Sequence, residues 1–182
     1  MSTIAVDNIE PRTAGGSVNI PELKLAGQIL QVVTSNKNTT QIITPTSALN
    51  WQDVSDMSVN ITPATGNKVL VLVNAQVSSK QDYQQNARIV RESTAIGVGT
   101  AAGSKPAASF MWRSHGDPAC YNLAGSYLDE SPGGNGSTAI TYKFQVSGES
   151  TYYILINRAY TESDSYQYGQ LHSSITVMEI GS

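Results

Sequence analysis

The residues of this sequence best suited to chemistry are tyrosines that lie among short polar residues near the C-terminus. In the segment 159–170, Tyr160, Tyr166 and Tyr168 are interspersed with serine, glutamine and Asp164. Aromatic rings stack on sugar rings, while carboxylates and amides hydrogen-bond sugar hydroxyls. We therefore expect this segment to contact a carbohydrate receptor. The alternative is that the rings pack over the edge of the core and the polar residues cap an irregular loop.

A second candidate contact is the run in which Trp112 precedes Arg113-Ser114-His115-Gly116-Asp117. An exposed tryptophan would anchor a ligand beside His115 and Asp117, although a tryptophan near a strand end more often fills the core or a subunit seam. Ser, His and Asp from one short loop do not converge with the orientation of a catalytic triad. We expect Trp112, His115 and Asp117 to serve binding and predict no catalytic residue.

Carboxylates that a glycosidase would pair across a sugar bond are spread along the chain. They are Asp53, Asp56, Glu92, Asp117, Asp129, Glu130 and Asp164. Strand starts and turns, where several of them fall, are places where acids serve solvation and turn geometry. A polysaccharide-cleaving enzyme therefore stays the least favoured hypothesis.

No metal or cofactor is predicted. Cys120 and the two histidines, His115 and His172, do not complete a zinc site. The two carboxylates in the segment 161–165 do not supply the six to eight oxygens of a calcium site. We expect Cys120 to be a small buried or half-buried residue and His172 to be a hydrogen-bonded structural residue.

The composition of the chain argues against some classes of binding partner. Of the 182 residues only 14% are charged, against roughly 25% in an ordinary soluble domain, and the net charge is −3. Without a run of like charge, capture of nucleic acid or of an anionic membrane is not expected. No segment approaches the roughly 18 apolar residues of a membrane span, and the N-terminus lacks a signal-peptide pattern. We expect one compact domain, made in a cytoplasm, without membrane insertion.

Alternation of apolar and polar residues indicates strands. Residues 138–146 place Ile140, Tyr142, Phe144 and Val146 on one face. The segment 68–77 has a second apolar face near its start, which is typical of a central strand. The predicted strands are residues 29–34, 39–44, 55–62, 68–77, 87–93, 108–113, 121–129, 138–146, 151–157 and 173–180.

Turn residues separate these segments at roughly 8–14 residue intervals, which favours an all-β fold. We predict an antiparallel β-sandwich of jelly-roll type over residues 28–182, with Trp51 in its core. Residues 151–157 are apolar on both faces, so either the second sheet or another copy of the chain must cover them.

Residues 1–27 form a different kind of segment, an extended N-terminal arm. Its apolar residues are scattered among proline and glycine and cannot close a core by themselves: they are Ile4, Val6, Ile9, Val18, Ile20, Leu23 and Leu25. We expect these side chains to order against another subunit or a larger assembly. The alternative is a terminus without a fixed structure.

Several short runs, taken in order, carry a resemblance. They are Ser2-Thr3-Ile4-Ala5-Val6-Asp7-Asn8-Ile9, Ala26-Gly27-Gln28-Ile29-Leu30-Gln31-Val32-Val33, Ile61-Thr62-Pro63 before Asn67-Lys68-Val69-Leu70-Val71, Tyr127-Leu128-Asp129-Glu130-Ser131-Pro132 before Thr141-Tyr142-Lys143-Phe144-Gln145, and the terminal segments 153–158 and 173–180. In order and span, the chain resembles short virion proteins of tailed bacteriophages, often from phages of marine bacteria and cyanobacteria.

The resemblance implies a tail fibre or another virion component: a trimeric or otherwise multimeric surface protein with an N-terminal attachment segment. A surface poor in charge suits a particle in water or seawater, because salt screens long-range electrostatics. We expect a homotrimeric tail fibre or tip subunit, located in the virion, that attaches to other phage proteins through residues 1–27. It would bind host surface polysaccharide without catalysis. The alternative is a head decoration protein that cements the capsid.

Overall fold

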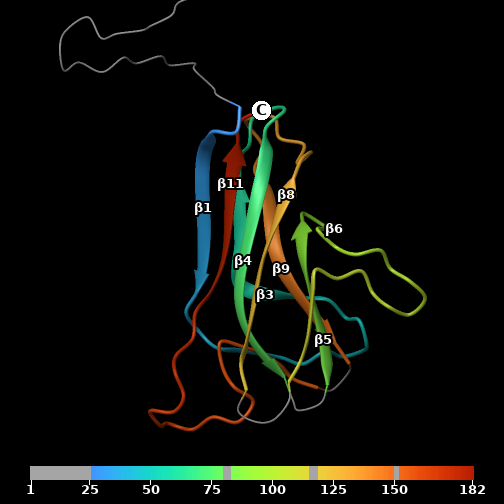
Figure 1. The fold of residues 1–182 in the computed structure, drawn as a ribbon, viewed down its shortest axis with the longest axis vertical. Helices are drawn as coiled ribbons and strands as arrows, with labels where there is room; N and C mark the ends of the chain where they lie inside the picture. Colours follow the sequence, from blue (N-terminus) through green and yellow to red (C-terminus); the bar gives the residue numbers. More distant parts are fainter. Residues whose placement is uncertain (1–25, 80–82, 115–118, 150–151) are drawn as a thin grey trace, which may run out of the picture.

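The computed structural model describes residues 26–79, 83–114, 119–149 and 152–182 (Figure 1). The arm residues predicted to attach to the virion, from Ile4 to Leu25, lie outside this part of the chain, as do His115 and Asp117. The described ranges form eleven β-strands: β1 (Ile29–Lys37), β2 (Gln41–Ile43), β3 (Gln52–Ile61), β4 (Lys68–Ser79), β5 (Gln84–Arg91), β6 (Thr94–Ile96), β7 (Phe110–Arg113), β8 (Tyr121–Asp129), β9 (Ile140–Gly148), β10 (Ile154–Ile156) and β11 (Ser173–Ile180).

The strands make two sheets in which every pairing is antiparallel. Sheet A has the order β1-β11-β4-β10-β2, and β8 pairs with the other side of β4. Sheet B has the order β3-β9-β5-β6, and β7 also pairs with β5. The prediction of an all-β, antiparallel fold is therefore confirmed.

The hydrophobic core lies between the two sheets. On β4, Val69, Val71 and Val77 are fully buried. On β9 the predicted face of alternate residues points inward, and Phe144 meets Phe110 of β7 edge to face, with ring centroids 6.1 Å apart. Since β4 has strands on both sides, its predicted central position is also confirmed.

Strand ends differ more from the sequence prediction than strand positions do. Residues 121–129 and 173–180 were predicted with the bounds that β8 and β11 have, whereas β6 was not predicted. Of the predicted strand 151–157, the described residues 152–157 contribute only the three residues of β10. Ile154, Leu155 and Ile156 are all buried within a single chain, so the chain itself covers both faces of this strand.

A bulge in β3 brings the two sheets together along one edge. Its pairing with β9 shifts between Asp53 and Ser58, and Asp56 has a φ of 58°. Because the bulge adds residues to β3, it shifts the alternation of side chains between the two faces, and both Val54 and Met57 point into the core. The Asp56 carbonyl accepts a hydrogen bond of 2.8 Å from the hydroxyl of Ser35 on β1.

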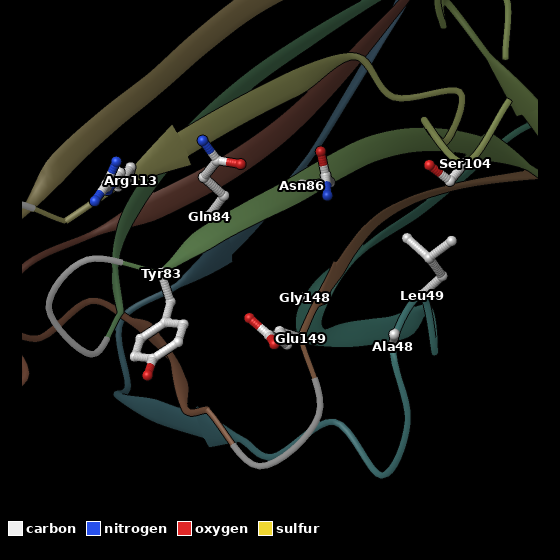
Figure 2. A pocket seen from close by; sticks show the side chains of 9 residues that line it. All are labelled: Ala48, Leu49, Tyr83, Gln84, Asn86, Ser104, Arg113, Gly148 and Glu149. Carbon is white, nitrogen blue, oxygen red and sulfur yellow. The ribbon is translucent and has the colours of Figure 1, made fainter. Parts of the chain in front are cut away.

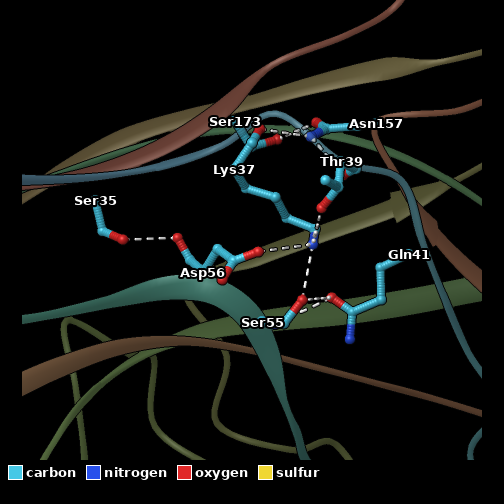
Figure 3. A network of polar contacts seen from close by, with 8 residues as sticks. All are labelled: Ser35, Lys37, Thr39, Gln41, Ser55, Asp56, Asn157 and Ser173. Atoms are coloured by element: carbon cyan, nitrogen blue, oxygen red, sulfur yellow. Dashed lines mark hydrogen bonds and ion pairs between the residues drawn. The ribbon is translucent and has the colours of Figure 1, made fainter.

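A buried lysine completes this edge (Figure 3). Lys37 is 1% exposed, and its Nζ donates to Ser55 Oγ at 2.8 Å and to Thr39 Oγ1 at 3.3 Å. The same Nζ lies 3.8 Å from Asp56 Oδ2. Buried ammonium groups need such partners, so this polar cluster ties the end of β1 in sheet A to β3 in sheet B.

Different parts of the chain lie at the two ends of the strands. The Gly27 amide donates to the Gly181 carbonyl and the Gly181 amide to the Gln28 carbonyl, both at 2.8 Å. The start of the described chain therefore lies beside the C-terminus, at the top of Figure 1. The segment between β10 and β11 lies at the opposite end of the strands, at the lower left of that view.

Candidate functional site

The β10–β11 loop, residues 157–172, carries the predicted tyrosines, and its two ends are fixed to the sheet. Asn157 has a φ of 60°, a conformation that asparagine tolerates better than most residues. Its Nδ2 donates to the carbonyls of Lys37 at 2.8 Å and Thr39 at 3.1 Å. At the other end of the loop, Ser173 Oγ donates to Asn157 Oδ1 at 2.6 Å. One side chain thus holds both ends of the loop.

The first turn of the loop is held by further contacts. Ser78 Oγ donates to the carbonyl of Arg158 at 2.8 Å, and Ala159 is buried. Arg158 Nη2 lies 3.4 Å from Glu162 Oε1, an ion pair within the loop. These contacts give the Arg158 guanidinium a defined position beside the polar residues that follow.

A hollow of about 320 Å³ opens within this loop. It is lined by Arg158, Glu162, Ser163, Asp164, Ser165, Tyr168, Gly169 and Gln170. A smaller hollow of about 180 Å³ adjoins it, and Glu162, Tyr168 and Gly169 line both. Guanidinium, carboxylate, hydroxyl and amide groups beside an aromatic ring are the groups that hydrogen-bond and stack on a sugar.

The predicted loop residues divide into three groups. Asp164 and Tyr168 both line the larger hollow. Tyr166 is 97% exposed. Tyr160 is half-buried. The tyrosines are therefore not one stacking platform, and Tyr168 is the ring that the fold places among polar groups.

Three aromatic or sulfur-containing residues differ from expectation. Trp112, predicted as an exposed anchor, is 6% exposed, because it lies on the face of β7 that packs into the core. Trp51, expected in the core, is half-buried with the guanidinium of Arg88 4.1 Å above its ring. Cys120, expected to be buried or half-buried, is exposed.

His172 occupies an exposed position at the end of the loop. Its Nε2 lies 3.1 Å from Asn36 Oδ1, so the expected hydrogen bond is present. The bond connects the loop to β1, and it adds a third tie between the loop and sheet A beside those of Asn157 and Ser78.

Asp129, expected to be a solvated turn acid, is buried instead. Both of its oxygens accept from Arg91 Nη1, at 2.9 and 2.8 Å, and Oδ2 accepts from Tyr142 Oη at 2.8 Å. Burial, together with this bond to the Asp129 carboxylate, raises the pKa of Tyr142 well above its usual value. Asp129 thus connects the end of β8 in sheet A to β5 and β9 in sheet B.

Asp53 belongs to a charged cluster on the outer face of sheet B. It accepts from Gln145 Nε2 at 2.6 Å and from Lys143 Nζ at 3.2 Å. Burial raises the pKa of Asp53, but these hydrogen bonds and the charges of Lys143 and Arg88 outweigh it and hold the pKa below its usual value. Within the described ranges, no group of three or more His, Cys, Asp and Glu side chains is placed to hold a metal ion.

A groove that the sequence analysis did not predict lies beside the start of β5 (Figure 2). Its volume is about 550 Å³, and it is lined by Ala48, Leu49, Tyr83, Gln84, Asn86, Ser104, Arg113, Gly148 and Glu149. A hollow of about 650 Å³ continues it and shares Gln84, Asn86 and Ser104. These residues come from separate parts of the chain, so no local pattern in the sequence could have indicated the groove.

Comparison with models of known protein families gave no match, and comparison with the curated proteins gave none either. Among the described segments, no helix is long and apolar enough to cross a membrane.

Proposed function

We propose that this chain is a virion surface protein of a tailed bacteriophage, a tail fibre or tip subunit that contacts the host by binding alone. The observation that supports this most directly is the placement of two features at opposite ends of the strands. Residues 1–27 join the β domain beside Gly181, and the polar hollow around Tyr168 lies at the other end. A protein that attaches at one end and contacts a receptor at the other needs this arrangement.

The finer fold that we propose is a jelly roll. Four strands of each sheet follow the orders β1-β11-β4-β8 and β3-β9-β5-β7, and in chain order these eight strands alternate between the sheets except for β5 and β7, which are neighbours in sheet B. A chain wound in this way forms two Greek keys. We propose further that three such domains associate, with the three arms at one end of the assembly.

Binding by the Tyr168 hollow would be weak for one copy. The hollow is small and open, so few of its groups could surround a sugar at once. Three copies on one fibre, and several fibres on one particle, raise the overall avidity by orders of magnitude without new contacts. This is why a multimer suits the proposed role in host attachment.

Free protein should compete with whole phage for host cells. We expect the purified full chain to reduce phage adsorption, and Tyr168→Ala to lose at least tenfold in competing strength. Thr65→Ala is a matched control, because Thr65 is exposed at the opposite end. Equal competition by all three proteins would reject the receptor role of the loop.

The location of the protein on the particle distinguishes a tail fibre from the alternative, a head decoration protein. An electron-dense label on Ser182, visualised by cryo-electron microscopy of whole particles, should appear on tail appendages. Labels spread over the capsid lattice would replace the fibre proposal with decoration. Release of reducing ends from host polysaccharide by the purified chain would instead establish an enzyme.

A further inference from the structure

The two outer faces of the molecule differ in charge. The outer face of sheet B carries the cluster of Asp53, Lys143 and Arg88 described above, with Gln145 between them. On the outer face of sheet A, the residues of β1, β11, β4 and β8 that point away from the core are apolar, hydroxyl or amide residues along most of the strands' length. Charged residues appear there only as the pair Lys68 and Glu130 at one end, 3.3 Å apart.

One row of this face is apolar across all four strands. The register pairs Val32 with Met178, Met178 with Leu70, and Leu70 with Leu128. Val32 is 53% exposed and Leu128 is 39% exposed, while the two residues between them are half-buried. Ile29 and Ile180 lie next to this row, and Ile29 is also 53% exposed. We call this set the apolar row.

We infer that the apolar row is the surface through which copies of this chain associate, with the β1 side of one copy against the β8 side of the next. The most exposed residues stand at the two ends of the row, Val32 on β1 and Leu128 on β8, as a ring of copies requires. Such a contact joins two different edges of the same face, and it forms a closed ring of three without a free edge when each copy is rotated by a third of a turn from the last.

The lack of charge on this face favours a second copy as the occupant. The centre of a subunit interface is depleted in charged residues, which describes this face and not that of sheet B. Four strands of about eight residues span about 19 Å by 27 Å, or roughly 500 Å² in projection. Side-chain relief makes the accessible area larger than this projection, but each copy in the ring divides the face between two neighbours, so each contact buries less than the roughly 800 Å² per partner of a standard interface.

Rotation about one axis also keeps all chains parallel. The copies then present their residue 26 ends together and their Tyr168 hollows together, at opposite ends of the ring. The inference rests on the proposed association of three copies but not on the proposed receptor contact, so the two can fail separately.

Cross-linking tests the contact. In a Cys120→Ser background, the pair Val32→Cys and Leu128→Cys cannot close within one chain, because three strand spacings of about 4.8 Å separate the two residues. Mild oxidation of the full chain should therefore give a ladder ending at three times the 19.4 kDa mass of one chain. The control pair is Ser58→Cys with Ala95→Cys, which ends the corresponding row of sheet B and should stay uncross-linked.

A charge substitution tests the same surface without cysteines. By sedimentation, we expect the unmodified full chain to have the mass of three chains, Val32→Asp to have the mass of one, and the exposed sheet B variant Ser58→Asp to remain a trimer. A trimer that persists in Val32→Asp, with no ladder from the cysteine pair, would overturn the inference and leave the proposed trimer standing.

A monomeric full chain would overturn both the interface and the trimer, while the competition assay on Tyr168 would still test the receptor role. If the Val32→Cys thiol of such a monomer resists alkylation, residues 1–25 of the same chain are the occupant, and the inference is again overturned. A stable dimer would exclude the closed ring of three.

Discussion

Arg91 at the end of β5 and Asp129 at the end of β8 form an ion pair of 2.8 Å that joins the two sheets. The two residues are 38 positions apart in sequence, and the Asp129 side chain is only 6% exposed. Tyr142 donates to the same carboxylate from β9. Three strands therefore depend on one acid for their polar partners at this end of the core.

Removing the Asp129 carboxylate should destabilise the fold. We expect Asp129→Ala to lower the free energy of unfolding by about 3–5 kcal/mol, because it leaves the Tyr142 hydroxyl without its acceptor and the Arg91 guanidinium without its counter-charge, with only the Ser131 carbonyl remaining. Chemical denaturation would measure this loss, and an unchanged m value would show that the surface exposed on unfolding is the same in both proteins. Glu130→Gln is the matched control: its pair with Lys68 is exposed, so the loss should stay below about 1 kcal/mol. Similar losses for both variants would contradict the structural role of Asp129.

Tyr142 should make the fold sensitive to alkali. Its folded pKa lies above the value of about 10 in an unfolded chain, so the contribution of the neutral hydroxyl is complete below pH 10 and is lost as the pH rises beyond it. We expect the free energy of unfolding, measured from pH 8 to pH 11.5, to fall less steeply in Tyr142→Phe than in the unmodified chain. Tyr166→Phe, at a 97% exposed position, should retain the original slope. Parallel slopes for all three proteins would refute the assignment.

In the Lys37 cluster, we expect the buried hydrogen bonds of the lysine to contribute more to stability than its exposed partner Asp56. Lys37→Met removes two hydrogen bonds from a fully buried group, and we expect a loss of about 1–3 kcal/mol in the free energy of unfolding. Asp56→Asn should cost less than about 1 kcal/mol, because that carboxylate is 60% exposed and 3.8 Å from Nζ, and asparagine tolerates the positive φ. Urea titrations of the two variants check the order, and a larger loss for Asp56→Asn would reverse it.

Close packing inside the sandwich gives a further test at Gly125. A Cβ at this position of β8 would lie 2.7 Å from the ring of Phe110, so Gly125→Ala must displace that ring from its contact with Phe144. We expect a loss of about 1–3 kcal/mol, as in other overpacked cores. Gly99→Ala is the control, since a Cβ there would meet nothing within 4 Å. Thermal unfolding of both variants measures the difference, and unchanged stability in Gly125→Ala would show that the ring has room to move.

By itself, the sequence determined the class of fold and the position of most strands. Alternation of side chains is a property of two or three neighbouring residues, so segments such as residues 121–129 and 173–180 could be predicted to the residue. It also indicated the loop that contains Asp164 and Tyr168, because turn and polar residues interrupt the alternation there.

Tertiary structure decided which residues meet across the chain. Asp129 became a buried partner of Arg91, Lys37 was enclosed beside β3, and Trp112 faced the core, since each outcome depends on the pairing of distant strands, and that of Lys37 also on the bulge in β3. The apolar row exists for the same reason. Val32, Leu70, Leu128 and Met178 are unremarkable in sequence, and only the register of four strands aligns them on one face.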